Sequence, residues 1–322
     1  MSDHILYLSG SDLDKVDLAP SVIRGVIRDA FRSYSSSDIK VPPKQTLRIT
    51  SDHYFQAMAA VSTQPSFAAV KWVGLNGANS QRGLANVNGL VILSEFETGR
   101  PLAVLDGNRL TIIRTAAMSA LAAEYLAPPK ATSLGFIGSG AQASGHVAAL
   151  HDVLPELANV ICYDRRAESA ENLARHATAQ GLGGRTSERI DEVLACDVVI
   201  STVPSVKGMQ PFLNAHKLRP GALAIAVDMG RSWFPDSLAS FDYYATDDRA
   251  QAEDPENQSK LGYPGPFDAD LSELASGSVK GRHSSTDRTL FLYPGFALAD
   301  LAVASELYLR AVQANIGVQL GR

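Results

Sequence analysis

The sequence predicts an α/β fold, because its two parts have different strand patterns. After residue 130, short apolar strands alternate with longer helical segments, which is the pattern of βαβ units around a parallel sheet. Before that point, strand-like segments follow one another with only turns between them, which favours a mainly antiparallel sheet. A chain of 322 residues is long enough for two domains with substantial cores.

The first part is expected to begin with a helix and to continue as strands. The helix covers 18–34, where Pro20 lies near the start and apolar residues recur at helical spacing. The strands expected after it are 45–50, 54–61, 67–73 and 89–94. The turn Glu97-Thr-Gly-Arg100 separates two apolar runs, so 87–93 and 101–105 are expected to form a hairpin.

The second part opens with a long alanine-rich helix at 110–126, which ends before Pro128-Pro129. The strands expected after it are 133–137, 159–163, 197–202 and 222–227, and the expected helices are 143–154 and 167–180. The polar segment 247–266, rich in Pro and Gly, is expected to be a loop. The tail, 297–316, is expected to be an amphipathic helix with an apolar face made of Leu298, Leu301, Ala302, Leu309 and Val312.

Composition and charge exclude several classes of partner. The formal net charge of −5 leaves no broadly basic surface, so nucleic acid is not expected as a partner. The two cysteines, Cys162 and Cys196, lie outside any paired motif, which argues against a disulfide scaffold and a thiolate zinc site. Because the sequence has no signal-peptide pattern and no apolar run of membrane-spanning length, we expect a cytoplasmic protein without membrane contact.

Gly138-x-Gly140-x-x-Ala143 is the most informative motif, since it follows an apolar strand and opens a helix. Gly138 permits a tight turn, Gly140 lets the backbone approach a pyrophosphate, and Ala143 allows close packing of helix on strand. The first N–H groups of the helix would then face the diphosphate. The next strand ends in Asp164, about twenty residues past the motif, where a ribose-binding carboxylate belongs. The motif therefore predicts a Rossmann domain that binds NAD(P).

The choice between NAD and NADP depends on Asp164 and its neighbours. The carboxylate would bind ribose hydroxyls and repel a 2′-phosphate, whereas Arg165 and Arg166 could bind that phosphate, so NAD is preferred and NADP stays open. Asp164 could also cap the helix after it. The strand ends Ser201-Thr-Val-Pro204 and Ala226–Gly230 are further ligand positions of a parallel sheet. The residues predicted to bind the cofactor are Thr115, Gly138, Ser139, Gly140, Ala141, Gln142, Asp164, Arg165, Thr202, Val203, Asp228, Met229 and Gly295.

Several charged residues occur next to apolar or strand-like sequence. Asp228 follows a fully apolar strand, and its ordinary alternative is a turn or capping role. Lys71 lies in the middle of an apolar strand, where a surface lysine on an edge strand is the usual explanation. Arg114 is placed at a helix start, where the helix dipole disfavours a cation unless an anion binds there too. With Arg48, these two cations are candidates for an anion site.

Four stretches together resemble the ornithine cyclodeaminase/μ-crystallin family, and the likeness covers nearly the whole chain. They are 70–73, 93–103, 110–117 and 135–143. The resemblance implies a Rossmann domain at 113–296, inserted in an α+β substrate-binding and dimerisation domain at 1–112, to which a C-terminal helix at 297–322 returns. It also implies a homodimer that uses a nicotinamide cofactor on amino-acid-like substrates.

The resemblance also implies roles for individual residues. Arg48, Lys71 and Arg114 would bind the substrate carboxylate, and Asp228 would lie beside the reacting amine or imine. Asp228 and Lys71 are therefore the predicted catalytic residues. No metal is expected, because the histidines form no HExxH motif or carboxylate cluster; His146 and His151 are expected to cap or decorate their helix. The sequence also has no GxSxG elbow, which argues against a hydrolase.

Two departures from the family pattern bear on the reaction. Ornithine cyclodeaminase-like members carry a glutamate just before a Met-Pro pair, whereas this chain has Gln56-Ala-Met-Ala59. They follow the aspartate with a Pro-Gly-Lys type turn, whereas this chain has Asp228-Met-Gly-Arg231. Arg231 and Trp233 could shape a different pocket, or belong to ordinary surface packing.

The departures favour reduction of the C=N bond of a small α-imino acid by NAD(P)H, or the reverse oxidation of an amino acid. The expected substrate carries a carboxylate and is a cyclic ketimine such as pyrroline-2-carboxylate. Two alternatives stay open. One is an ornithine cyclodeaminase-type lyase with tightly bound NAD, and the other is a non-catalytic NADPH-dependent binding protein like μ-crystallin.

Overall fold

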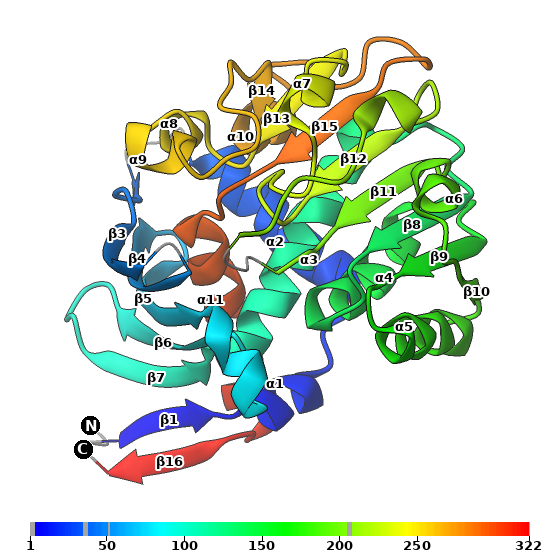
Figure 1. Cartoon of the computed structure of the whole chain (residues 1–322). Helices are drawn as coiled ribbons and strands as arrows, with labels where there is room; N and C mark the ends of the chain where they lie inside the picture. The colour runs from blue at the N-terminus through cyan, green and yellow to red at the C-terminus, as the bar shows by residue number, and fades with distance from the viewer. Residues whose placement is uncertain (1–3, 35–37, 51, 205–207, 322) are drawn as a thin grey trace. The chain divides into compact units, whose positions relative to one another are not determined.

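The computed structural model describes residues 4–34, 38–50, 52–204 and 208–321. The chain divides into two units (Figure 1): unit 1 comprises residues 1–115 and 296–322, and unit 2 comprises residues 116–295. The first boundary falls inside a single helix, α3 (Gly107–Leu126). Each unit has its own sheet, one mostly antiparallel and one parallel, so the predicted α/β fold class is confirmed.

The sheet of unit 1 is antiparallel at every pairing except that of β1 with β7. Its strand order is β16-β1-β7-β6-β5-β4-β2, with β3 also paired to β4. The strands are β1 (His4–Leu8), β2 (Ile39–Lys40), β3 (Gln45–Thr50), β4 (His53–Thr63), β5 (Ser66–Asn76), β6 (Val87–Glu95), β7 (Pro101–Asp106) and β16 (Val318–Gly321). The five strands from β3 to β7 were predicted from the sequence, and β6 and β7 form the expected hairpin.

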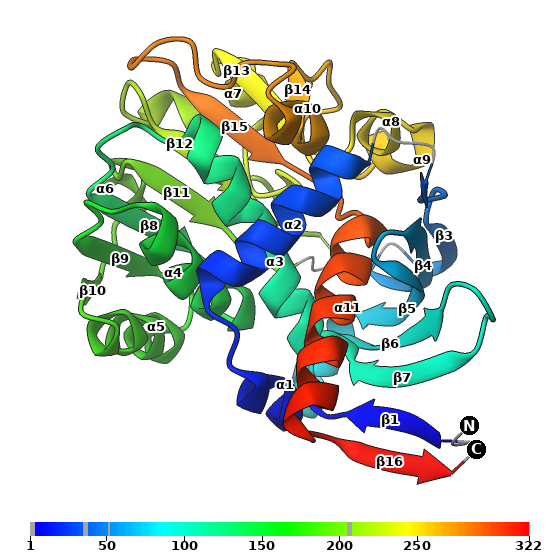
Figure 2. The same cartoon turned by 180° about the vertical axis from the view of Figure 1, so that it is seen from behind.

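The helices of unit 1 are α1 (Gly10–Val16), α2 (Pro20–Ser33), the 3₁₀ helix η1 (Gly77–Arg82) and α11 (Ala297–Ala314). Helix α11 crosses one face of the sheet over β4, β5 and β6, and α2 packs on α11 (Figure 2). Pro20 is the first residue of α2, as its fixed backbone angle favours. One apolar face of the sheet is therefore covered by α11, and α11 is in turn covered by α2.

The prediction for the tail helix is partly wrong. Buried residues of α11 lie between Ala297 and Leu307, apart from Ala311, so the last turns have little cover. Leu309 and Val312 are consequently about half exposed, at 47% and 51%, and do not extend the buried face. The helix ends at Ala314 and is capped by Asn315, whose φ of 55° is left-handed, and the chain then turns into β16.

The sheet of unit 2 is parallel throughout, in the order β10-β9-β8-β11-β12-β15-β13-β14. The strands are β8 (Ser133–Ile137), β9 (Asn159–Tyr163), β10 (Gly183–Thr186), β11 (Val198–Ser201), β12 (Leu223–Ala226), β13 (Tyr243–Thr246), β14 (Ala269–Asp270) and β15 (Thr289–Leu292). The chain leaves β8 towards β9 and β10, and then returns to β11 on the other side of β8. This reversal between β8 and β11 is the point at which doubly wound sheets bind ligands.

The helices of unit 2 beyond α3 are α4 (Ala141–Val153), α5 (Ala167–Ala179), α6 (Ile190–Leu194), η2 (Ala215–Lys217), α7 (Pro235–Leu238), α8 (Arg249–Ala252), α9 (Pro255–Gln258) and α10 (Leu271–Ser276). Helix α3 packs on α4 through the small residues Ala116, Ala120 and Ala149. The predicted loop at 247–266 contains two short helices, α8 and α9. Each is started by the side chain of an aspartate, Asp248 or Asp254, that accepts a backbone N–H.

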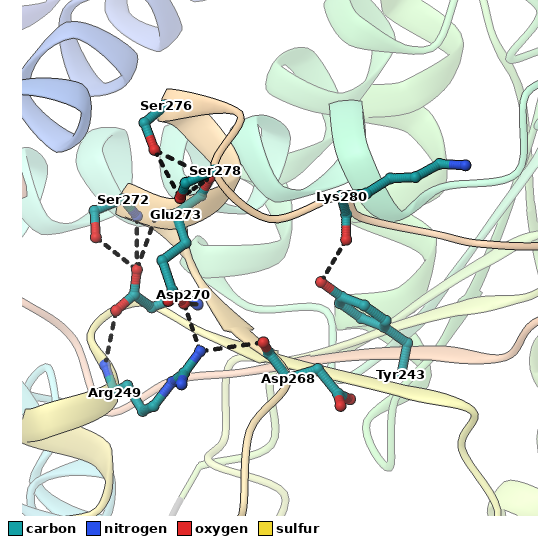
Figure 3. A network of polar contacts seen from close by, with 9 residues as sticks. All are labelled: Tyr243, Arg249, Asp268, Asp270, Ser272, Glu273, Ser276, Ser278 and Lys280. Atoms are coloured by element: carbon teal, nitrogen blue, oxygen red, sulfur yellow. Dashed lines mark hydrogen bonds and ion pairs between the residues drawn. The ribbon is translucent and has the colours of Figure 1, made fainter.

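A polar network closes the β13–β14 edge of this sheet (Figure 3). Asp270 accepts hydrogen bonds from the backbone N–H groups of Ser272 and Glu273 and so caps α10, while Glu273 accepts from the Asp270 N–H in return. Arg249 donates to the Asp268 carbonyl at 3.1 Å and pairs with the Glu273 carboxylate. Every partner in this network has a local structural role, so we assign it to the stability of the edge.

Cys162 and Cys196 are both free and buried. Burial raises the pKa of each thiol to about 12, so neither has thiolate character near neutral pH. Within the described ranges, no helix combines the length and apolar character needed to cross a membrane. No group of three or more potential metal ligands occurs among these residues.

Candidate active site

The glycine-rich turn joins β8 to α4. Gly138 has a φ of 88°, a left-handed backbone that favours glycine. A Cβ at this position would also lie 3.1 Å from the backbone of Thr202, the residue after β11, and would crowd it. Gly140 is the N-cap of α4, and in the described part of the chain a Cβ there would meet no atom within 4 Å. Ala143 is fully buried. The space beside Gly140 is therefore open at a helix N-terminus, as a diphosphate site requires.

Helix α4 has no side-chain N-cap hydrogen bond among the described residues. The backbone N–H groups of Ala141 and Gln142 lie in its first turn, where helix geometry leaves N–H groups without an intrahelical acceptor. The Ser139 side chain is buried, and its hydroxyl faces the Tyr163 carbonyl at 3.4 Å. These first-turn N–H groups fit the oxygens of a dinucleotide diphosphate.

Asp164 is fixed by the glycine-rich turn itself. Its Oδ2 accepts a hydrogen bond from Ser139 N at 2.8 Å, and its Oδ1 accepts one from Arg166 N at 2.9 Å. The N-cap of α5 is Arg166, so the alternative that Asp164 caps this helix is wrong. A carboxylate has about four acceptor positions, so two remain for ribose hydroxyls. Arg165 is exposed beside it.

The end of β11 is tied to the same turn. Thr202 N donates to the Ile137 carbonyl and Thr202 Oγ1 donates to the Gly138 carbonyl, each at 2.9 Å. Val203 packs against the core of unit 2. The structure thus brings Gly138, Ser139, Asp164 and Thr202 together at the carboxyl ends of β8, β9 and β11.

Asp228 follows β12 and is buried, with three donors on its carboxylate. Ser201 Oγ donates to Oδ1 at 2.9 Å, Gly230 N donates to Oδ1 at 3.1 Å, and Ser232 Oγ donates to Oδ2. Burial raises the pKa of Asp228, while these hydrogen bonds and the charge of Arg231 act in the opposite direction. The carboxylate is therefore both oriented and poised to titrate above the ordinary aspartate range.

Trp233 holds Ser201, one of the donors to Asp228, in place. Its Nε1 donates to Ser201 Oγ at 3.0 Å, which leaves the Ser201 hydroxyl hydrogen for Asp228. Trp233 is fully buried, so the alternative of surface packing is wrong for it. Arg231 Nε donates to the Asp228 carbonyl, and Met229 has a left-handed φ of 61°. A positive φ on a side chain of this size is uncommon and marks a tightly constrained turn after β12.

Lys71 lies on β5, between β4 and β6, and only 2% of it is exposed. It is therefore not the surface lysine of an edge strand. Its Nζ donates to Asp300 Oδ1 at 2.8 Å, and this is its one hydrogen bond among the described residues. An ammonium carries three N–H donors, so two remain for a ligand. Burial lowers the pKa of Lys71 to about 8; the charge of Arg114 acts in the same direction, and Asp300 acts against both.

Arg114 lies beside the same carboxylate, with Nε 3.2 Å from Asp300 Oδ1. It is buried, at 7% exposed. Helix α3 begins at Gly107, however, so Arg114 lies in its third turn, and the prediction of a cation at the helix start is wrong. The sequence pattern placed the start late because the polar residues Asn108 and Arg109 break the apolar run. Lys71 and Arg114 are brought together, as predicted, but by Asp300 rather than by a helix dipole.

Arg48 and Gln56 lie elsewhere in unit 1. Arg48 is exposed on β3, with its guanidinium 5.4 Å from the centre of the Tyr54 ring. It pairs with Tyr54 of β4, whereas Lys71 pairs with Met58, four residues further along that strand. Gln56 is on β4 and donates from Nε2 to Thr46 Oγ1 at 3.1 Å. The structure therefore separates Arg48 from the buried cation pair.

Two further residues of the predicted cofactor set lie at the ends of the two units. Thr115 is buried and is the last residue of the first segment of unit 1, and Gly295, with a φ of 89°, is the last residue of unit 2. Gly295 accepts a hydrogen bond from Gln251 Nε2 at 3.4 Å. Their roles towards a cofactor stay predictions.

Two groups of polar residues were missed by sequence reasoning. Asp300 reads as one acidic residue in an apolar helix, and only its register in the first turn of α11 could have marked it as buried. His146 was expected to decorate α4, but it is fully buried, and its ring lies between the Gln142 carbonyl and Ser119 Oγ, which in turn meets the Tyr293 hydroxyl. Burial lowers the pKa of His146 to about 4, so the ring is neutral and Nδ1–H donates to Gln142.

Comparison with known proteins places this geometry in a family. An alanine dehydrogenase of Archaeoglobus fulgidus is 31% identical over 302 residues, which cover 91% of each chain. A Δ(1)-pyrroline-2-carboxylate reductase of Bacillus cereus is 30% identical over 277 residues, covering 82% of this chain and 83% of the relative. A solved structure of an archaeal alanine dehydrogenase dimer with bound NAD aligns with a TM-score of 0.86 at 28% identity, over 98% of this chain and 99% of that one.

The family model of the ornithine cyclodeaminase/mu-crystallin family matches residues 15–315. This range includes the whole sheet of unit 2 and strands β2 to β7 of unit 1. It also includes the glycine-rich turn, the Lys71–Asp300–Arg114 cluster and Asp228. The resemblance that the sequence motifs indicated is confirmed. The chain belongs to the ornithine cyclodeaminase/mu-crystallin family.

Proposed function

We propose that the chain is an NAD(H)-dependent oxidoreductase that reduces the C=N bond of a small α-imino acid, or oxidises the corresponding amino acid in reverse. The model substrate is pyrroline-2-carboxylate, which the reductase of Bacillus cereus is named for. The observation that carries the proposal is the buried ammonium of Lys71, which keeps two N–H donors for a ligand beside the guanidinium of Arg114. A carboxylate is the ligand that such a pair of cations recognises best.

The carboxylate of the substrate is assigned to unit 1. Lys71 and Arg114 hold it by charge-assisted hydrogen bonds, which are strong where water is excluded. Both side chains are fixed by Asp300, so little conformational entropy is lost when the ligand binds. A substrate without a carboxylate gains none of this energy, and so specificity for α-imino or α-amino acids follows.

The cofactor is assigned to unit 2. The residues that would hold it are the first-turn N–H groups of α4, the open backbone at Gly140 and the carboxylate of Asp164, which selects a free ribose 2′-hydroxyl. When bound, the nicotinamide supplies a hydride to the imine carbon or accepts one from the amine carbon. The preference for NAD over NADP follows from Asp164, and exposed Arg165 leaves weaker use of NADP open.

Asp228 is assigned to the nitrogen of the substrate. Reduction of C=N to CH–NH adds a hydride to carbon and leaves a proton on nitrogen, and the iminium is a better hydride acceptor than the imine. A buried carboxylate stabilises that positive charge and keeps the proton on nitrogen. Three hydrogen bonds, from Ser201, Ser232 and the Gly230 N–H, orient Asp228 for this task. The carboxylate is therefore already in position before the substrate binds.

A spectrophotometric screen tests the proposed reaction. NADH and NADPH would each be offered with pyrroline-2-carboxylate, piperideine-2-carboxylate, pyruvate plus ammonia and pyruvate plus amines, with cofactor oxidation as the readout. We expect turnover of at least one imino acid, faster with NADH than with NADPH. The reverse assay uses L-proline and L-alanine with NAD⁺.

Ornithine without added NADH is the control for redox-neutral chemistry. Release of ammonia from ornithine, with no net change in the cofactor, would replace the reductase by a cyclodeaminating lyase. Tight cofactor binding without oxidation by any imino acid would contradict an enzymatic role of this kind.

A homodimer is the assembly that we propose for this chain. The face of the unit 1 sheet opposite α11 exposes apolar side chains from adjacent strands: Trp72 of β5 lies directly across from Leu90 of β6, and Ile92 is the next residue of β6 on that face. Their exposed fractions are 46%, 46% and 40%. An exposed apolar patch on a sheet favours association. The occupant that we assign is a second copy of the chain, because the archaeal relative with NAD is a dimer.

Replacing Leu90 by Lys is expected to shift the protein from dimer to monomer in analytical ultracentrifugation at micromolar concentration, because a buried, unpaired ammonium opposes association. Leu309→Lys is the matched control, since Leu309 is 47% exposed in the same unit but lies on α11. A dimer that persists in the Leu90 variant, or dissociates equally in both, would show that this face is not the interface.

A further inference from the structure

The buried carboxylate of Asp300 contacts both cations of the proposed carboxylate site in unit 1. It is 1% exposed and lies in the first turn of α11, where the helix dipole favours a negative charge. Its Oδ1 contacts both cations of the proposed carboxylate site, at 2.8 Å to Lys71 Nζ and 3.2 Å to Arg114 Nε. Its Oδ2 has no hydrogen-bond partner among the residues that the structure describes.

The surroundings of Lys71 show that Asp300 is what favours its protonated form. In the sheet, the residues directly opposite Lys71 are Met58 on β4 and Val91 on β6, which are apolar. The charged groups that act on it are Arg114 from α3, which disfavours the ammonium, and Asp300 from α11, which favours it. Burial disfavours the ammonium most strongly. Asp300 is therefore the one carboxylate, of those acting on Lys71 in the described structure, that opposes its loss of a proton.

We propose that Asp300 is a positioning residue of the carboxylate site, which aims Lys71 and keeps it protonated, so that binding of a substrate carboxylate is coupled to proton uptake by Lys71. The proposal rests on the proposed function, because it takes the carboxylate to be the substrate's. Asp300 itself does not contact the reacting atoms; it acts through Lys71 and Arg114.

The direction of the coupling follows from the charges. With Asp300 in place the pKa of Lys71 is about 8, well below the ordinary 10.5. A bound carboxylate adds a second negative charge and raises that pKa, so binding takes up a proton wherever free Lys71 is partly neutral. Near pH 6.5 Lys71 is already charged and almost no uptake is expected. Near pH 8.5 most of the free side chain is neutral, so uptake of most of one proton is expected, and uptake rises further towards pH 9. We call the pH range in which binding takes up a proton the uptake window. Without Asp300 the uptake window moves down by ~1–3 pH units, the usual effect of one nearby opposite charge.

Calorimetry of the complex with NADH measures this coupling without catalysis. L-Proline is titrated into the full-length protein saturated with NADH; since both are reduced, no turnover occurs. Repeating the titration in two buffers of different ionisation enthalpy gives the number of protons taken up, between about pH 6.5 and 9. The wild type is expected to take up protons only in the upper half of this range, and Asp300→Asn already near pH 7, with affinity declining from that lower pH.

Three further variants separate position from charge. Lys71→Arg keeps a positive charge that does not titrate, and its proton uptake is expected to be absent over the whole range. Asp300→Glu restores a carboxylate and is expected to hold the window within about one pH unit of the wild type. Asp12→Asn changes a first-turn aspartate of α1, which pairs with Lys15, and is expected to leave the window unchanged.

A second readout does not depend on the substrate. The Lys71 resonance, assigned by its loss in Lys71→Arg, is followed by NMR of ¹³C-labelled lysine in the protein without proline. It is expected to titrate near pH 8 in the wild type and lower in Asp300→Asn. If Asp300→Asn fails to fold, as near-UV circular dichroism would show, the wild type, Lys71→Arg and Asp300→Glu still test the coupling.

The outcomes keep the two proposals apart. An unchanged uptake window and an unchanged Lys71 titration in Asp300→Asn would overturn the role of Asp300, whatever the substrate. Proton uptake that survives in Lys71→Arg would also overturn it, because another group would then be the one that titrates. A wild type that neither binds L-proline nor reduces any imino acid, but whose Lys71 titrates as stated, would overturn the substrate assignment and leave the Lys71–Asp300 coupling standing.

Discussion

Replacing Lys71 by Met is expected to lower kcat/KM for the imino acid by at least about 100-fold while NADH affinity stays unchanged. The methionine matches the length of the lysine but removes the ammonium, and with it hydrogen bonds between charged groups of about 1.5–3 kcal/mol each. Every 1.4 kcal/mol corresponds to tenfold in rate or affinity. Apart from Thr115, the predicted cofactor residues lie in unit 2, whereas Lys71 lies in unit 1. The measurement is steady-state kinetics beside NADH binding by fluorescence.

The controls for this variant separate a loss of substrate binding from a loss of folding stability and from a general effect of removing a lysine. Lys71→Met leaves Asp300 without its closest cation, and breaking a buried ion pair costs roughly 3–5 kcal/mol of folding free energy. Thermal unfolding must therefore show a folded protein at the assay temperature. Lys40→Met is the matched control, because Lys40 lies exposed on β2 of the same sheet and should keep full activity. Arg114→Met should behave like Lys71→Met. An equal loss of NADH binding and turnover would contradict the assignment.

The elements that the sequence predicted well are those with a strong local signal. The strands 45–50, 133–137 and 159–163 agree with the structure residue for residue, because apolar and alternating runs are bounded there by polar or turn residues. The glycine motif could be placed correctly because its glycines are required by the local backbone, as the positive φ of Gly138 shows. Local chemistry is therefore enough for the cofactor turn.

Some of the elements that were missed depend on distant partners. Strand β1 at the N-terminus is held by β16 at the C-terminus and by β7, and no local pattern predicts such pairing. The same holds for the site in unit 1. Lys71 and Asp300 are 229 residues apart in sequence, so the ion pair that gives Lys71 its properties is a product of the tertiary fold. Sequence motifs could nominate Lys71 and Arg114 but not the carboxylate between them.

Replacing Asp228 by Asn is expected to lower kcat by about 10²–10⁴-fold with a smaller change in KM and in cofactor affinity. This is the range that general acid–base groups contribute. Asparagine keeps the size of the side chain, and its amide oxygen can still accept from Ser201 Oγ and Gly230 N, so the turn after β12 is preserved. The charge that stabilises an iminium is lost. Pre-steady-state measurement of NADH oxidation isolates this step from product release.

The pH dependence of kcat tests whether the titration of Asp228 controls the rate. Burial already raises the pKa of Asp228, and the rate is expected to fall as the pH drops through that pKa, because the protonated acid no longer stabilises a cation. Ser232→Ala removes a hydrogen bond that favours the carboxylate, so the acid limb of kcat should move to higher pH. Asp236→Asn, an exposed aspartate of α7, should leave that limb in place. If the acid limb keeps its pH in Ser232→Ala, the loss of a hydrogen bond to Asp228 does not affect it. The limb would then report the titration of another group, which contradicts the role of Asp228.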